Sequence, residues 1–152
     1  MEKRILAVTQ EAIARDIRVQ GGVSSQFYHK SSSWFWEKHS ADFAESALKI
    51  ARESKDNGAI QVAVATYLWD GLARRDDAIQ VMQSARRRGV LDGGNAEVLL
   101  SWMEQAGRWK EAVRLAQELV KATPDNLNRR TRLASDLWQA GQKSAARRTL
   151  KD

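Results

Sequence analysis

The segment Gly107-Arg108-Trp109-Lys110-Glu111-Ala112 lies in the most regular part of this sequence. A glycine followed five residues later by an alanine is a common spacing in a helix–turn–helix unit. The glycine ends one helix, and the alanine lies where the second helix crosses closely over the first. The same spacing recurs at Gly141 and Ala146, and Ala73 and Ala78 hold the equivalent positions upstream. These segments follow one another at a step of 34 residues.

Five series of apolar residues share this 34-residue step. They are Ala44, Ala78, Ala112 and Ala146; Phe35, Trp69, Met103 and Leu137; Leu48, Met82, Ala116 and Leu150; Ala51, Ala85 and Leu119; and Ala65, Leu99 and Leu133. Chance explains one alanine series, because alanine is common in this chain. Five series in one register indicate an internal repeat.

The period and the order of small and large residues resemble the tetratricopeptide repeat family. The match is best from Ala96 to Asn126, close over residues 59–150 and loose over 25–58. The sequence departs from the family pattern at the first-helix tryptophan position, which holds Val62, Ala96 and Arg130. The resemblance implies an all-α fold, in which antiparallel helix hairpins stack into a right-handed superhelical α-solenoid.

The expected organisation is one helical-repeat domain over residues 1–152. It comprises an N-terminal helix within 1–22 and four repeats at 25–58, 59–92, 93–126 and 127–152, the last of them truncated. The predicted helices are 2–20, then the pairs 24–37 with 40–54, 58–71 with 75–89, 94–106 with 109–122, and 126–140 with 143–151. Because no polar helix follows to shield the last apolar face, we expect a longer array or an end that packs on another chain.

Composition bounds the class of protein. The chain is 43% hydrophobic and 29% charged with one proline, which is typical of an ordered helical protein. It has no cysteine, so disulfides, thiolate metal sites and cysteine catalysis are excluded. It also has no apolar run of about 18 residues and no apolar core of a secretory signal. We therefore expect no membrane partner and a cytoplasmic location.

Catalytic motifs are missing from the sequence. The histidines are His29 and His39, which lie ten residues apart and do not form a metal pair at one-turn spacing. Neither a phosphate-binding glycine loop nor a nucleophile elbow is present. We therefore expect a protein that is not an enzyme and needs no cofactor or metal, with both histidines at the surface.

The resemblance implies that the first helix of each repeat lines a concave groove, which binds a protein or peptide. The predicted groove residues are Trp36, Tyr67, Asp70, Glu97, Ser101, Asn128, Arg132, Ser135 and Trp138. Tryptophan, tyrosine and arginine are the usual anchors of interfaces. The alternative for each aromatic residue is burial between helices. Only Arg132 fits the positions with which some family members clamp a carboxylate, so the sequence does not predict such a clamp.

The formal net charge of +6 and the pI of about 9.9 favour an acidic partner. Arg86–Arg88 end a predicted helix, where cations suit the helix dipole. Arg129, Arg130 and Arg132 begin one, where the dipole does not favour them. A stripe of these arginines would bind nucleic acid, but interspersed acids and the lack of a known motif argue against that alternative. The other alternative is a subunit that self-associates through the ends of its repeat stack.

Overall fold

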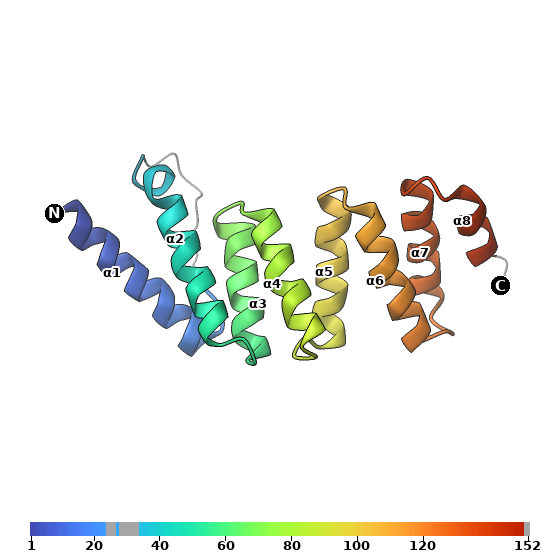
Figure 1. Ribbon diagram of the computed structural model, residues 1–152, viewed down its shortest axis with the longest axis horizontal. Coiled ribbons are helices and arrows are strands. Elements are labelled where there is room, and N and C mark those ends of the chain that lie inside the picture. Colours follow the sequence, from blue (N-terminus) through green and yellow to red (C-terminus); the bar gives the residue numbers. More distant parts are fainter. Residues whose placement is uncertain (24–26, 28–33, 151–152) are drawn as a thin grey trace. The chain divides into compact units, whose positions relative to one another are not determined.

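The chain is all-α in a computed structural model that describes residues 1–23, 27 and 34–150 (Figure 1). The helices are α1 (Glu2–Arg15), the π-helix η1 (Asp16–Gln20), α2 (Trp34–Glu53), α3 (Gly58–Thr66), the π-helix η3 (Tyr67–Gly71), α4 (Arg75–Arg87), α5 (Gly93–Gln105), α6 (Trp109–Ala122), α7 (Leu127–Gln139) and α8 (Lys143–Thr149). No strand occurs in these described residues, which confirms the predicted fold class at the level of all-α.

The predicted helices other than 24–37 and 40–54 agree with the structure to within two residues at each end. The predicted break near residue 38 is wrong, because Trp34–Glu53 is one uninterrupted helix. This segment contains neither glycine nor proline and is rich in alanine, glutamate and lysine, which favour a continuous helix. Apart from Phe27, the start of the predicted helix 24–37 lies outside the described residues.

The chain divides into two compact units, Met1–Asn95 and Ala96–Asp152, here called the N-terminal and C-terminal units. In the N-terminal unit α1 packs on α2, α2 on α3, and α3 on α4. In the C-terminal unit α6 packs on α7, and α7 on α8. The alanine series Ala44, Ala78, Ala112 and Ala146 is buried throughout. The small side chains therefore allow the close packing of helices that the period predicts, whereas the single domain over 1–152 stays a prediction.

The turns between paired helices repeat in the structure as they do in the sequence. Ala73, Gly107 and Gly141 lie 34 residues apart, and their φ angles are 54°, 69° and 80°. This left-handed conformation costs about 1 kcal/mol for a residue with a Cβ, so a glycine is expected at such a turn. Ala73 adopts this left-handed conformation although it is not a glycine. Packing of the flanking helices therefore sets this turn, and the left-handed conformation recurs at a position where the sequence has no glycine.

His39 is buried, with 8% of its surface exposed, so the prediction of a surface role is wrong. Its Nε2 lies 2.8 Å from Oε1 of Glu2 on α1, and its Nδ1 lies 2.8 Å from Oδ2 of Asp42. The hydrogen bonds to Asp42 and then to Glu2 raise the pKa of His39. The ring also lies 4.9 Å from that of Phe35. His39 therefore joins α1 to α2, while His29 lies outside the described residues.

Candidate partner-binding surface

Helices α5 and α7 carry complementary polar stripes in the C-terminal unit. Glu97, Ser101 and Glu104 recur at steps of four and three on α5. Arg129, Arg132 and Asp136 recur at steps of three and four on α7. Such steps place each set on one face of its helix. The two faces meet, and we call these six residues the α5–α7 cluster.

Arg132 is the centre of the α5–α7 cluster. Its Nε and Nη2 donate to the two carboxylate oxygens of Glu104 at 2.6 and 2.8 Å. Its Nη1 donates to Oε2 of Glu97 at 3.1 Å, and Nη2 also donates to Oγ of Ser101 at 3.1 Å. The hydrogen bonds to Glu104, followed by the negative charges of Glu104 and Glu97, raise the pKa of Arg132. A ligand carboxylate would have to displace bonds within the chain, so the geometry does not favour Arg132 as an anchor for an acidic partner.

Glu97 extends the cluster to a second arginine. Its Oε1 accepts a hydrogen bond of 2.7 Å from Nε of Arg129. Arg129 also donates from Nη1 to Oγ1 of Thr123 at 2.7 Å. Both arginines are therefore engaged by side chains of the C-terminal unit. The stripe of free cations that a nucleic-acid backbone needs is not formed by Arg129 and Arg132.

Asp136 is the buried member of the cluster, with 2% of its surface exposed. Its Oδ2 has no hydrogen-bond partner. Burial, followed by the charge of Glu104 and a hydrogen bond shared with it, raises the pKa of Asp136 to about 7, although Arg132 acts in the opposite direction. The carboxyl group therefore keeps its proton in the fold at pH values where an exposed aspartate has lost it.

Asp136→Asn is expected to raise the free energy of unfolding at pH 8 by about 1–2 kcal/mol. Since the pKa in the fold lies above its ordinary value of 3.8, the stability linked to the proton is fully present below about pH 4. That stability is lost as the pH rises through 7. The side-chain amide of asparagine still donates a hydrogen bond toward Glu104, and it carries no charge at either pH. Urea unfolding at pH 5 and pH 8 tests this, and equal gains at both values would contradict it.

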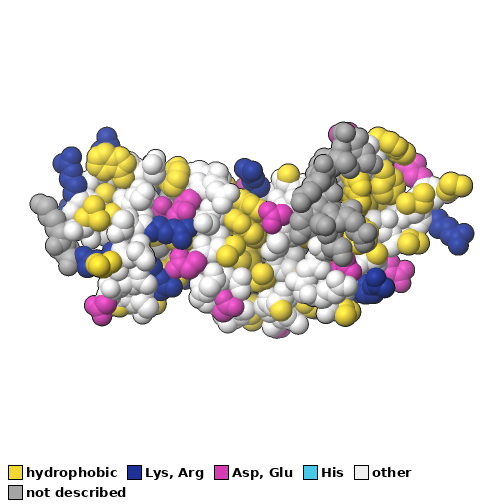
Figure 2. Space-filling model, turned by 180° about the vertical axis from the view of Figure 1, so that it is seen from behind, with side chains coloured by type: hydrophobic (Ala, Val, Ile, Leu, Met, Phe, Trp, Pro, Cys, Tyr) yellow, Lys and Arg dark blue, Asp and Glu magenta, His cyan; other side chains and the backbone are white. Residues whose placement is uncertain are grey.

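The exposed side of α7 carries three of the predicted groove residues together with Thr131. Asn128, Thr131, Ser135 and Trp138 recur at steps of three and four, and all are exposed. We call them the α7 stripe. Trp138 is 46% exposed, and Nζ of Lys143 lies 5.2 Å from its ring. On the C-terminal part of the face in Figure 2, exposed hydrophobic side chains lie near basic side chains flanked by acidic ones.

The predicted groove residues of the N-terminal unit do not form a comparable surface. Tyr67 is fully buried, so its predicted exposure in a groove is wrong. Its hydroxyl donates to the carbonyl of Phe27 at 3.3 Å, which satisfies the polar end of a buried ring. Trp36 is half-buried, with its ring 4.7 Å from that of Phe43. Asp70 is exposed in η3.

Sequence reasoning missed the pairing of α5 with α7, although both helices were predicted. Arg129 and Asp136 were not among the predicted groove residues, yet both contribute to the cluster. The sequence contains a signal for this pairing. Two glutamates share one face of a predicted helix, and two arginines share one face of a helix in the next repeat. Periodicity gives the face of each helix, whereas the partner of that face depends on tertiary packing.

The structure also bears on metal sites and on membrane-spanning helices. The part of the chain that the structure describes holds no group of three or more His, Asp and Glu residues placed to bind a metal ion. Within the same ranges, no helix has both the length and the apolar character needed to cross a membrane. No protein-family model and no curated protein matches this chain. The tetratricopeptide resemblance therefore rests on the repeat period and the order of small and large residues in the sequence.

Proposed function

We propose that this chain is a non-catalytic helical-repeat module that binds another protein or a peptide through the α7 stripe. The observation that carries the proposal is the exposure of Trp138, which is 46% accessible on a helix otherwise anchored in the core. The 34-residue period and the recurring left-handed turns support a tetratricopeptide-like stack. In such a stack α7 is a first helix and faces the concave groove.

The α7 stripe has the chemistry of an interface anchor. A tryptophan side chain offers a large apolar surface together with one N–H donor, and tryptophan is enriched among residues that dominate binding energy. Covering the exposed part of Trp138 would contribute about 2 kcal/mol from apolar burial. Ser135 and Asn128 add neutral hydrogen-bonding groups on the same side of α7. The stripe therefore fits an uncharged polar segment with an apolar side chain.

The α5–α7 cluster gives this stripe a rigid base. Arg132 joins α7 to both Glu97 and Glu104 of α5, so the helix that presents Trp138 is held by ion pairs. The opposite charges within these pairs neutralise one another, so recognition depends on the uncharged side chains of the α7 stripe. An enzymatic role gains no support from the raised pKa of Asp136, because this carboxyl group is buried.

Trp138→Ala is expected to weaken partner binding at least tenfold and to leave the helical content unchanged, because the side chain is exposed. Trp34→Ala is the matched control, since Trp34 on α2 is 62% exposed and undergoes the same chemical change. Partners captured from a lysate of the source cell with the wild-type chain are measured again with each variant. Retention of the partner by Trp138→Ala would contradict the proposal for α7.

A second candidate function is self-association through α1 and the π-helix η1 that continues it. Ile13 and Ile17 are buried, whereas Val8 and Val19 are 61% and 76% exposed. A helix with apolar side chains on its outer side favours contact with another repeat stack. Sedimentation velocity distinguishes the two functions, because self-association depends on the concentration of the chain and is expected to disappear in Val8→Glu.

A further inference from the structure

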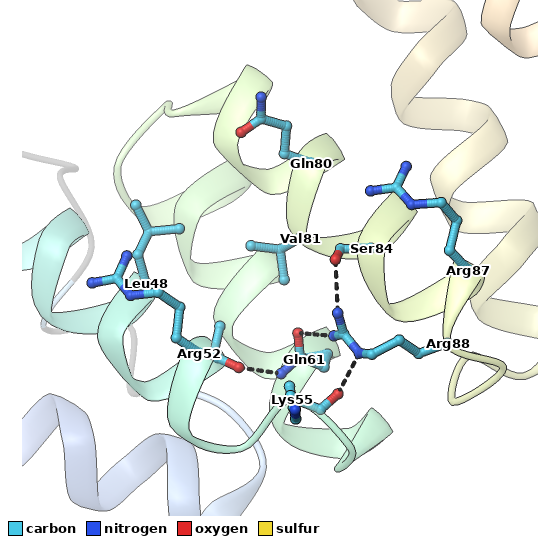
Figure 3. A pocket seen from close by; sticks show the side chains of 10 residues that line it. Leu48, Arg52, Lys55, Gln61, Gln80, Val81, Ser84, Arg87 and Arg88 are labelled. Atoms are coloured by element: carbon cyan, nitrogen blue, oxygen red, sulfur yellow. Dashed lines mark hydrogen bonds between the residues drawn. The ribbon is translucent and has the colours of Figure 1, made fainter.

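A pocket of about 450 Å³ opens between α2 and α4 of the N-terminal unit (Figure 3). Its apolar part is formed by Leu48, Ala51 and Val81. Its basic part is formed by Arg52, Lys55, Arg87 and Arg88. No aspartate or glutamate is among the residues that line it. The pocket therefore combines a cationic rim with an apolar floor.

Arg88 is held in place by three neutral acceptors. Its Nε donates to the carbonyl of Lys55 at 2.9 Å, its Nη1 to Oγ of Ser84 at 2.7 Å, and its Nη2 to Oε1 of Gln61 at 3.2 Å (Figure 3). A guanidinium carries five N–H donors, so two remain for a ligand. None of the three partners carries a negative charge. Arg88 is thus oriented by the fold while its positive charge stays available to an anion.

Gln61 makes this arrangement rigid. Its side chain is buried, and Nε2 donates to the carbonyls of Ala51 at 2.8 Å and Ser54 at 3.0 Å. The same amide accepts from Arg88, so one network joins the end of α2, the start of α3 and the end of α4. A group that is oriented before binding loses little conformational freedom when the ligand arrives.

The other cations of the pocket are only partly compensated. Arg52 pairs with Glu45, which lies outside the pocket lining. Lys55 and Arg87 are exposed, and neither charged group pairs with any residue in the described ranges. The C-terminal ends of α2 and α4 stabilise part of this positive charge, since a helix C-terminus carries about half a negative charge. An excess of positive charge remains at the pocket.

We propose that this pocket binds an acidic segment of a partner protein. Carboxylates of the segment pair with Arg88, Arg87 and Lys55, and an adjacent apolar side chain enters over Leu48 and Val81. Guanidinium groups suit carboxylates because they donate two parallel hydrogen bonds. The site is separate from the α7 stripe, which lies in the other unit and lacks free cations. It also locates the acidic partner that the net charge of +6 favours.

An acidic protein segment fits the pocket better than a nucleic acid does. A single-stranded nucleic acid needs a track of cations along its backbone and aromatic side chains on which bases stack. Here the cations line one pocket, and no aromatic residue lines it. The aliphatic floor suits a leucine, isoleucine or valine side chain instead.

The test is selection of a displayed library of random twelve-residue peptides on the full chain, followed by affinity measurements on the enriched peptides. The decisive variant is Lys55→Glu/Arg87→Glu, which reverses two exposed charges that hold no other group in place. Lys110→Glu/Arg114→Glu is the matched control, because it makes the same change of charge at exposed positions of α6. Trp138→Ala separates this site from the α7 stripe.

The expected result is enrichment of peptides with Asp or Glu beside an aliphatic residue. We expect their affinity to fall at least tenfold in Lys55→Glu/Arg87→Glu and with added salt, and to persist in the control and in Trp138→Ala. Enrichment without an acidic excess, no enrichment, or equal binding by both charge variants would overturn the proposal. A fluorescein-labelled twenty-nucleotide single strand that loses binding only in Lys55→Glu/Arg87→Glu would overturn it in favour of nucleic acid.

Discussion

Gly58→Ala is expected to lower the free energy of unfolding by about 2–4 kcal/mol. A Cβ at position 58 would overlap the carbonyl oxygen of Val90 and would lie 3.2 Å from its carbonyl carbon. Both are backbone atoms, so no side-chain rotation relieves the overlap. The start of α3 would have to move away from the end of α4.

The turn that brings Val90 against Gly58 is itself well defined. Gly89 has a φ of 74°, its amide bonds the carbonyl of Arg86, and the amide of Val90 bonds that of Ala85. These bonds close α4 with a left-handed C-terminal motif. The carbonyl of Val90 is therefore fixed by the backbone, and Gly58 is the residue that accommodates it.

Thermal and urea unfolding of Gly58→Ala, compared with Gly93→Ala, test this expectation. A Cβ at Gly93 would meet no atom within 4 Å, and the residue begins α5. Gly93→Ala is therefore expected to be neutral or stabilising by up to about 1 kcal/mol. Similar stabilities of the two variants would show that the contact between Gly58 and Val90 does not constrain the fold.

Arg132→Ala is expected to lower the free energy of unfolding by about 2–3 kcal/mol. The variant leaves Glu97 and Glu104 without their shared cation and removes a positive charge that acts on Asp136. The side chains of Arg132, Glu97 and Glu104 are 28%, 30% and 22% exposed, so water compensates part of the loss. The effect is therefore smaller than for a fully buried pair.

Urea unfolding at pH 8 measures this effect, with Arg114→Ala on α6 as the control. Arg114 is exposed and pairs with no residue in the described part of the chain, so we expect its loss to change stability by less than about 0.5 kcal/mol. A loss in Arg132→Ala no larger than in the control would mean that the α5–α7 cluster adds nothing to the fold. If the loss is confirmed, an Arg132 variant cannot serve as a probe of partner binding.

The order of helices and turns could be predicted from the sequence. Gly107, Gly141 and the alanine series indicate the period of 34 residues. From residue 58 onward, local propensity predicts each helix end to within two residues. These features depend on neighbours within one or two helical turns. The prediction failed between residues 34 and 54, where the repeat pattern was loose and no glycine or proline marked a break.

The surfaces depend on tertiary structure. Tyr67 and Arg132 occupied predicted groove positions, yet one is buried and the other is bound by two glutamates of α5. Arg88 was expected to end a helix or, alternatively, to join a stripe of arginines, but its partners come from three segments and hold it at a pocket. The helices, the repeat period and the excess of positive charge can be predicted without a structure, because they follow from local spacing and composition. Which arginines are neutralised depends on tertiary packing, because Arg132 pairs with Glu97 and Glu104 of a helix that lies about 30 residues earlier in the chain.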